Sequence, residues 1–200
     1  MDTLVSILIS LAPVLVTLGL MACVVLSFRL FIRRPRGVSE ADASGIRSVV
    51  VFQGDSPELF RDDREELPWV GVRLFTDLCA GLAARGISIA DRGPVENAQG
   101  ARCLVDGEPF LLVLERLDDC WVASVEFFPR SAAESRHLRL SHRAYAPGDS
   151  PALRRFLAAL DAWLKSHPGL SGIGWHRKEK WLGSRFSDAS PGPIEAAQNA

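Results

Sequence analysis

The sequence has no excess of charge of either sign. It holds 23 Lys and Arg residues against 24 Asp and Glu residues, so the formal net charge of the 200-residue chain is −1 at pH 7. Proteins that bind nucleic acid usually carry a clear positive excess, which neutralises the phosphates. This balance gives no reason to expect a nucleic-acid partner, and we expect none.

Cysteine is scarce, and its spacing does not fit the usual structural frameworks. The four cysteines are Cys23, Cys79, Cys103 and Cys120, and no two of them form a CxxC pair. Cys23 lies within an apolar run, so three remain for the rest of the chain. An odd number of cysteines without CxxC spacing makes a poor disulfide framework and a poor zinc site. We therefore expect reduced, structural thiols, as is usual in a reducing compartment.

The sequence also lacks a catalytic, metal-binding or phosphate-binding motif. His137 and His142 lie five positions apart, which does not make a chelate from one strand. The acidic run from Asp55 to Glu66 lacks the ligand alternation and the glycine of a calcium loop, so it is either a solvated loop or a docking patch for a basic partner. We predict no catalytic, cofactor-binding or metal-binding residues, and the sequence does not indicate an enzyme.

The N-terminal segment is apolar and free of charge. No charged residue occurs from Thr3 to Phe28, a stretch longer than the roughly 20 residues that a helix needs to cross a bilayer. The chain begins Met1-Asp2-Thr3, without the basic start of a cleaved signal peptide. The pattern predicts one transmembrane helix.

Basic residues follow this segment directly. They are Arg29, Arg33, Arg34 and Arg36, whereas Asp2 precedes it. Because positive charge near a membrane end is retained in the cytoplasm, we expect a single-pass protein of the inner (plasma) membrane with its N-terminus outside and its C-terminal part in the cytoplasm. The arginines would contact lipid headgroups, which makes the lipid bilayer the first predicted partner. Small residues four apart within the helix are compatible with a homodimer.

Composition divides the chain into four parts. We assign residues 1–36 to the transmembrane anchor with its basic juxtamembrane segment. Residues 37–45 are small and polar, which is typical of a linker. Residues 46–183 alternate apolar and polar patterns and form the predicted domain. Residues 184–200 are rich in Ser, Pro, Gly and Ala without an apolar period, which predicts a disordered tail.

Within the domain, periodicity predicts an α+β fold. Helical spacing occurs over 69–85 and again after Ser150-Pro151, a favourable N-cap and first helical residue. Asp106-Gly107 between apolar runs indicates a hairpin turn. Strands are expected over 48–52, 87–90, 102–105, 110–116, 120–128 and 136–145, and a short last helix over 175–182. The order predicts a two-layer domain in which two amphipathic helices cover one face of an antiparallel meander sheet.

Two basic clusters are the candidate contact residues for lipid or for a protein partner. The first lies in the strand expected over 136–145, and the second is flanked by Trp175 and Trp181. The residues that we single out are Arg139, Arg143, Arg177, Lys178 and Lys180. Basic residues among aromatic ones suit a headgroup interface, although solvated cations around packed tryptophans are the plainer explanation.

Three functions fit this sequence. The first is a non-catalytic protein-interaction module tethered to the membrane, with a protein partner that the sequence does not identify. The second is a membrane-tethered enzyme whose site is assembled from scattered residues, in which Glu126, His137 or His142 and a cysteine would converge. The third is a sensor of anionic lipid surfaces.

Overall fold

The computed structural model describes residues 45–54, 71–95, 98–117, 120–141, 147–178 and 189–194, and gives the side chains of all of these except 137–141. No helix within these ranges is long and apolar enough to cross a membrane. The predicted membrane anchor, its four arginines and nearly all of the predicted linker lie outside them.

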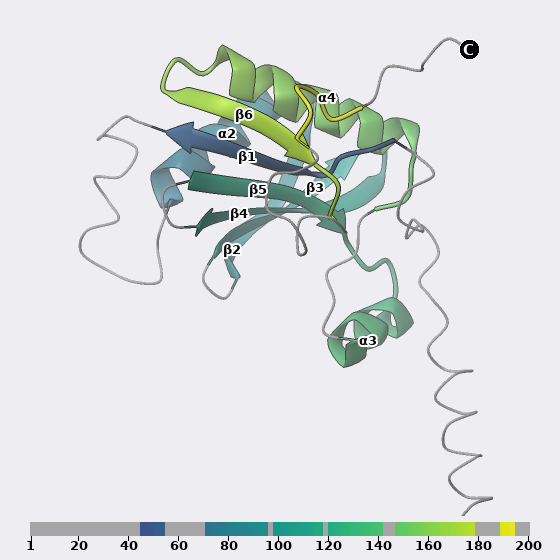
Figure 1. Cartoon of the computed structure of the whole chain (residues 1–200). Coiled ribbons are helices and arrows are strands. Elements are labelled where there is room, and N and C mark those ends of the chain that lie inside the picture. The colour runs from purple at the N-terminus through teal and green to yellow at the C-terminus, as the bar shows by residue number, and fades with distance from the viewer. Residues whose placement is uncertain are drawn as a thin grey trace, which may run out of the picture. The chain divides into compact units, whose positions relative to one another are not determined.

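The domain is built on one six-stranded antiparallel sheet (Figure 1). The strand order is β2-β3-β4-β5-β1-β6, so the first strand along the chain is inserted between β5 and β6. The consecutive hairpins from β2 to β5 form the predicted meander. The strands are β1 (Val49–Gly54), β2 (Ser88–Val95), β3 (Ala98–Val105), β4 (Glu108–Leu117), β5 (Cys120–Phe127) and β6 (Leu170–His176).

Two helices, α2 (Val72–Ala83) and α4 (Pro151–Ser166), pack on one face of this sheet, which we call the covered face. One continuous apolar cluster joins both helices to alternate residues of the strands. Phe156 of α4 meets Phe110 of β4 edge to face, with 5.7 Å between ring centroids. The α+β class predicted from the sequence is thereby confirmed.

Local sequence explains where these elements begin and turn. Ser150 caps α4, since its Oγ accepts a hydrogen bond from the Leu153 backbone N–H at 3.1 Å. The turn between β3 and β4 has positive φ at both Asp106 and Gly107, 51° and 81°, as the predicted hairpin requires. Gly71 precedes α2 at φ 79°, and a Cβ there would lie 2.6 Å from the Trp121 ring. The close approach of helix and sheet at this point therefore needs glycine.

The strand expected over 136–145 is wrong, because residues Ala132–Ser141 form a helix, α3. Ser131 begins it: its Oγ accepts from the backbone N–H of Glu134 at 3.2 Å. Ser131 and Glu134 have the Ser-x-x-Glu spacing of a helix start, and this signal outweighs the short alternation of polar and apolar residues that follows. Residues 142–145 lie outside the described part.

The short helix expected over 175–182 is also wrong in its first part. Trp175 and His176 end β6, and Trp175 pairs with Val50 of β1. Its side chain is fully buried on the covered face, and its indole N–H donates to the Asp161 carboxylate of α4 at 2.8 Å. Gly172 and Gly174 belong to this strand. Pairing with β1 and burial of the tryptophan explain why a glycine-rich segment is extended here.

Residues 189–194 belong to the predicted disordered tail, yet they return to the sheet as a segment that we call the strap. Ser190 and Trp175 exchange two backbone hydrogen bonds, of 2.8 and 2.9 Å. Ile194 pairs with Ile46 just before β1. Lys165 of α4 donates to the Pro191 carbonyl at 2.9 Å. The strap thus connects the edge strand β6 and the residue Ile46 before β1 with α4.

Candidate functional site

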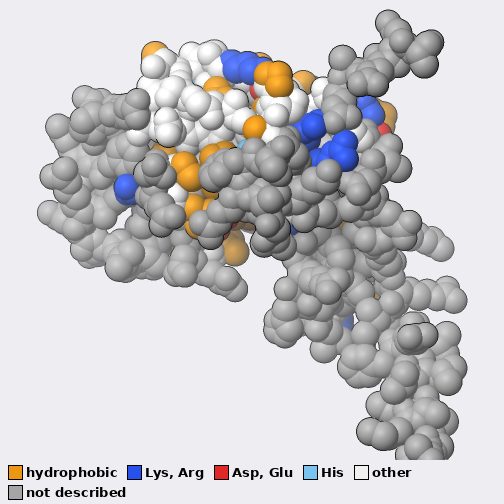
Figure 2. Space-filling model, in the orientation of Figure 1, with side chains coloured by type: hydrophobic (Ala, Val, Ile, Leu, Met, Phe, Trp, Pro, Cys, Tyr) orange, Lys and Arg blue, Asp and Glu red, His pale blue; other side chains and the backbone are white. Residues whose placement is uncertain are grey.

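The face of the sheet opposite α2 and α4, which we call the outer face, holds the most distinctive group of side chains. Side chains alternate between the two faces along a strand. The strand residues next to those in the apolar cluster of the covered face therefore point to the outer face. Val49, Val51 and Val122 form a small buried apolar cluster there, and Leu117 and Cys120 pack against it. Figure 2 shows both hydrophobic side chains and Lys and Arg side chains at the surface of the described residues in view.

Beside this apolar cluster lies a group of charged residues that we call the acid–lysine cluster: Glu115, Ser124, Glu126 and Lys178. One carboxylate oxygen of Glu126 accepts a hydrogen bond from the Ser124 hydroxyl at 2.9 Å, and also from the Lys178 ammonium. The side chains of Lys178 and Glu126 are only 15% and 14% exposed. An ion pair removed from water to this degree interacts more strongly than a surface pair.

Glu115 completes the cluster from the neighbouring strand. Burial raises the pKa of its carboxyl above the usual value, and the negative charge of Glu126 raises this pKa further, while Lys178 lowers it in part. Lys178 forms its ion pair with Glu126, so its positive charge only partly offsets the negative charge of Glu126 at Glu115. A cation brought by a partner next to Glu115 would relieve this repulsion.

A buried histidine lies in line with the cluster. Across β6, β1 and β5, the register aligns His176, Val49 and Ser124 in one row. His176 is 1% exposed. On β3, the Arg102 guanidinium lies 5.1 Å from the centroid of the Phe128 ring, a cation–π contact. The outer face therefore combines apolar, acidic and basic groups over several strands.

Two of the three described cysteines lie away from this site. Cys79 and Cys103 lie in the core of the covered face, where burial raises their pKa to about 11 and about 12. Both thiols are thus protonated at neutral pH, whereas a nucleophilic cysteine acts as the thiolate. The Cys120 thiol donates to the Leu117 carbonyl at 3.2 Å. Of the residues that the enzyme hypothesis brings together, Glu126 lies in the acid–lysine cluster, but His137 and His142 have no described side chains.

A separate groove lies between α2 and the edge strand β2. It has a volume of about 430 Å³, and its lining is mostly apolar, from Ala80, Ala83 and Ile89 among others. Arg92 is its one charged lining residue, and Cys79 also lines it. Since this thiol has a raised pKa, the groove does not offer a reactive group. Among the described residues, no group of three or more His, Cys, Asp or Glu could hold a metal ion.

The structure places the predicted contact residues in different settings. Lys178 is engaged in the ion pair with Glu126, and Arg177 beside it is partly buried. Arg139 lies in α3, with its side chain outside the described part. Arg143 and Lys180 lie outside the described ranges, as do Arg29, Arg33, Arg34 and Arg36.

Sequence reasoning missed Ser124 and Glu115 as members of the site, and it placed His176 only in the basic cluster flanked by Trp175 and Trp181. One signal was available near β5, where Ser124 and Glu126 lie between Val122 and Phe128 on one face of the strand. Polar side chains in a strand that is apolar on both faces need partners, because an unpaired buried polar group is costly.

No protein-family model matches the chain, and neither a curated protein nor a solved structure matches it. A function for this domain therefore has to be argued from the chemistry of its surfaces, since a fold by itself does not fix a function.

Proposed function

We propose that the chain is a membrane-tethered protein-interaction module without catalytic activity, and that its partner binds the outer face of the sheet. The observation that carries this proposal is the outer face itself, where the apolar cluster of Val49, Val51 and Val122 lies beside the acid–lysine cluster. The uncharged run from Thr3 to Phe28, with arginines after it, supports a single transmembrane helix, an outside N-terminus and a cytoplasmic domain at the inner membrane.

The composition of the outer face suits a protein partner. The three valines of the apolar cluster are themselves buried, so a partner would contact the partly exposed residues around them, such as Val113, Glu115 and Leu117, and the charged groups among these would select the partner and its orientation. The raised pKa of Glu115 favours a partner with a basic side chain at this point, since a Lys or Arg of that partner would stabilise the carboxylate. Neither α2 nor α4 lies on this face, because both pack on the opposite one.

A photo-crosslinking amino acid tests where the partner binds. We would place it at Val113 in the full chain, expressed in its membrane. Val113 lies on β4 between Leu112 and Leu114 of the core, so its side chain points to the outer face, where it is half-buried. The matched control position is Ala158, which is exposed on α4.

We expect a discrete adduct of higher mass from position 113 and none from position 158. Mass spectrometry of the adduct identifies its second component, and an adduct of two copies of this chain would identify the homodimer as the interaction. If position 113 gives no adduct, or if both positions give the same ones, the outer face is not the binding surface.

A second experiment tests the orientation. A C-terminal reporter enzyme that is active only outside the inner membrane should remain inactive in the full chain. The same reporter placed before Thr3 should be active. Strong activity of the C-terminal fusion would contradict the cytoplasmic location of the domain.

A further inference from the structure

Strand β2 lies at one edge of the sheet and is its most exposed strand (Figure 1). It pairs with β3 on one side, and no strand of the described ranges pairs with it on the other. Of its residues, only Ile89 and Gly93 are half-buried, and the rest are exposed. The backbone N–H and C=O groups along such an open edge can pair with the backbone of a further strand.

A β-bulge turns two side chains of β2 to the same face of the sheet. The register with β3 shifts just after Ile89, and Ala90 has no partner of its own. Strict alternation would place Ile89 and Arg92 on opposite faces. The bulge places both on the covered face, because their partners in β3, Cys103 and Ala101, belong to the core there.

The groove beside β2 is open because the helix side of it is built from small residues. Thr76, Ala80 and Ala83 follow helical spacing along one side of α2, and all three are exposed. Together with Ile89 and Ala90 they line a volume of about 430 Å³. A strand added at the edge of β2 would direct every second side chain to the covered face, and so into this groove.

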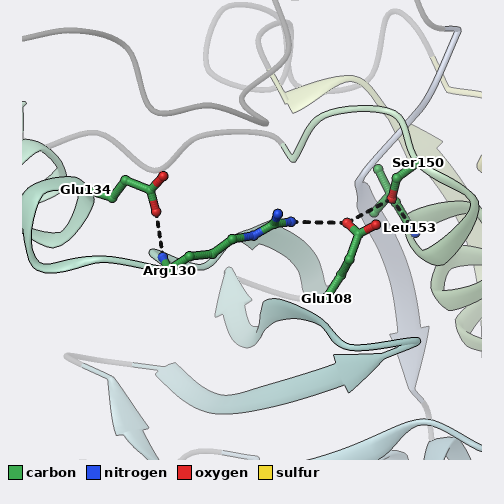
Figure 3. A network of polar contacts seen from close by, with 5 residues as sticks. All are labelled: Glu108, Arg130, Glu134, Ser150 and Leu153. Carbon is green, nitrogen blue, oxygen red and sulfur yellow. Dashed lines mark hydrogen bonds and ion pairs between the residues drawn. The ribbon is translucent and has the colours of Figure 1, made fainter.

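Arg92 gives the groove a positive charge. It lowers the pKa of the Cys79 thiol in part, so its guanidinium lies close to this other lining residue. Among the residues with described positions, no carboxylate lies within ion-pair distance of Arg92, and a partner could supply one. Other arginines of the surface are already paired within the domain: Arg130 with Glu108 at 3.1 Å (Figure 3), Arg154 with Asp149 at 2.7 Å, and Arg155 with Asp106 at 2.7 Å.

We infer that the edge of β2 and the groove beside it bind an extended acidic segment of a partner protein. The backbone of this segment would pair with β2. An aliphatic side chain would pack against Ala80, Ala83 and Ile89, and an Asp or Glu two positions away would pair with Arg92. In strand addition of this kind, main-chain hydrogen bonds supply affinity and alternate side chains supply specificity.

Two features limit what the edge can bind. Pro94 has no N–H to donate, so the added strand would be short, over about 88–93. A second copy bound through the same edge would bring another Arg92 to the groove instead of a carboxylate, which disfavours a homodimer here. This surface is separate from the outer face, so the inference does not depend on the proposed function.

Selection of peptides tests the inference. A library of short random peptides displayed on phage would be selected against the full chain in lipid nanodiscs, and in parallel against Arg92→Glu. From the first selection we expect peptides with an aliphatic and an acidic residue two positions apart. From the second we expect Lys or Arg in place of the acid. A synthetic peptide from the first selection should bind Arg92→Glu about tenfold or more weakly than the original chain.

Matched variants separate the groove from other effects. Arg155→Glu makes the same charge change on α4, outside the groove, and should retain binding. Ala80→Phe fills the groove from an exposed position of α2 and should abolish binding. Ala158→Phe adds the same side chain at an exposed position of α4 and should have no effect.

Hydrogen exchange shows whether the peptide adds to the strand. With the selected peptide bound, the amides of 88–93 should exchange several-fold more slowly than in the chain alone. The amides of β6, at the opposite edge of the sheet, serve as the internal reference and should be unchanged.

Three outcomes would overturn the inference. The first is that no peptide is enriched, or that the enriched peptides bind Arg92→Glu as tightly as the original chain. The second is protection of other strands without protection of 88–93. The third is protection of 88–93 without peptide as the concentration of the chain rises, which would show that a second copy occupies the edge. Binding of basic peptides by Arg92→Glu would show that this variant is folded.

Discussion

The two faces of the sheet differ in what they bury, although the same strands supply both. On the covered face, both helices and five of the strands share one large apolar cluster that includes Phe110, Trp121 and Phe156. On the outer face, the separate apolar cluster consists of three valines, and charged residues lie beside it. Apolar burial is the main source of folding stability, so the covered face should hold the domain together. In the proposed function, the outer face is the surface that a partner recognises.

The comparison is tested most directly on two neighbouring residues of β4. Leu112 points into the covered face and is fully buried, whereas Val113 points to the outer face and is half-buried. We expect Leu112→Ala to lower the free energy of unfolding by about 2–5 kcal/mol, because it removes buried methyl groups and leaves a cavity. Val113→Ala should lower it by about 1 kcal/mol or less. Chemical denaturation of the chain in mild detergent measures both, and equal losses would remove the distinction between the faces.

The next largest effect concerns the ion pair of the outer face. Lys178→Met would leave the Glu126 carboxylate without its ammonium partner in a site that is 14% exposed. We expect a loss of about 2–4 kcal/mol in the free energy of unfolding, because an uncompensated buried charge is costly. The double variant Glu126→Gln/Lys178→Met should recover most of this loss.

A surface ion pair serves as the control for that experiment. Arg155 and Asp106 are 51% and 52% exposed, and Arg155→Met should cost less than about 1 kcal/mol. If Glu126→Gln/Lys178→Met is as unstable as Lys178→Met alone, then packing of the lysine side chain, rather than its charge, stabilises the outer face.

The smallest expected effect is a gain in stability that depends on pH. The pKa of Glu115 is raised in the folded chain, first by burial and then by Glu126, so folding disfavours its carboxylate form. Above this raised pKa the folded state is destabilised relative to the unfolded one. Below the ordinary pKa of glutamic acid both states are protonated, and the effect is absent.

Glu115→Gln should therefore raise the free energy of unfolding at pH 7. The gain should disappear as the pH falls below the ordinary glutamic acid pKa. Denaturation curves of both chains across this range measure it. A variant that is less stable at pH 7 would show that the Glu115 carboxylate is favourably bound in the folded domain.

Local patterns in the sequence predicted the elements whose signals are local. The apolar period of α2 and α4, the cap at Ser150 and the turn at Asp106-Gly107 all appear in the structure near the predicted positions. The prediction failed for α3 because a short basic segment fits both a period of two and a helical period, and the start signal at Ser131 was not weighed.

The remaining errors come from contacts between distant residues. No local pattern indicates that β1 pairs with both β5 and β6, and this pairing is what extends the glycine-containing segment of β6. Lys178 was singled out as an exposed cation, yet it pairs with Glu126, 52 positions earlier in the chain. Its environment is fixed by the sheet order, which periodicity does not reveal. Glu115 and Ser124 were missed for the same reason.

The strap has a mechanical consequence. Ile46 pairs antiparallel with Ile194. The chain therefore enters the described domain and leaves it at neighbouring points. A load applied between these two points would open the strap one hydrogen bond at a time, as a zipper opens, and would leave the meander of β2 to β5 unstressed. The same proximity makes the domain suitable for insertion into a surface loop of another protein, since a host loop would not have to stretch across it.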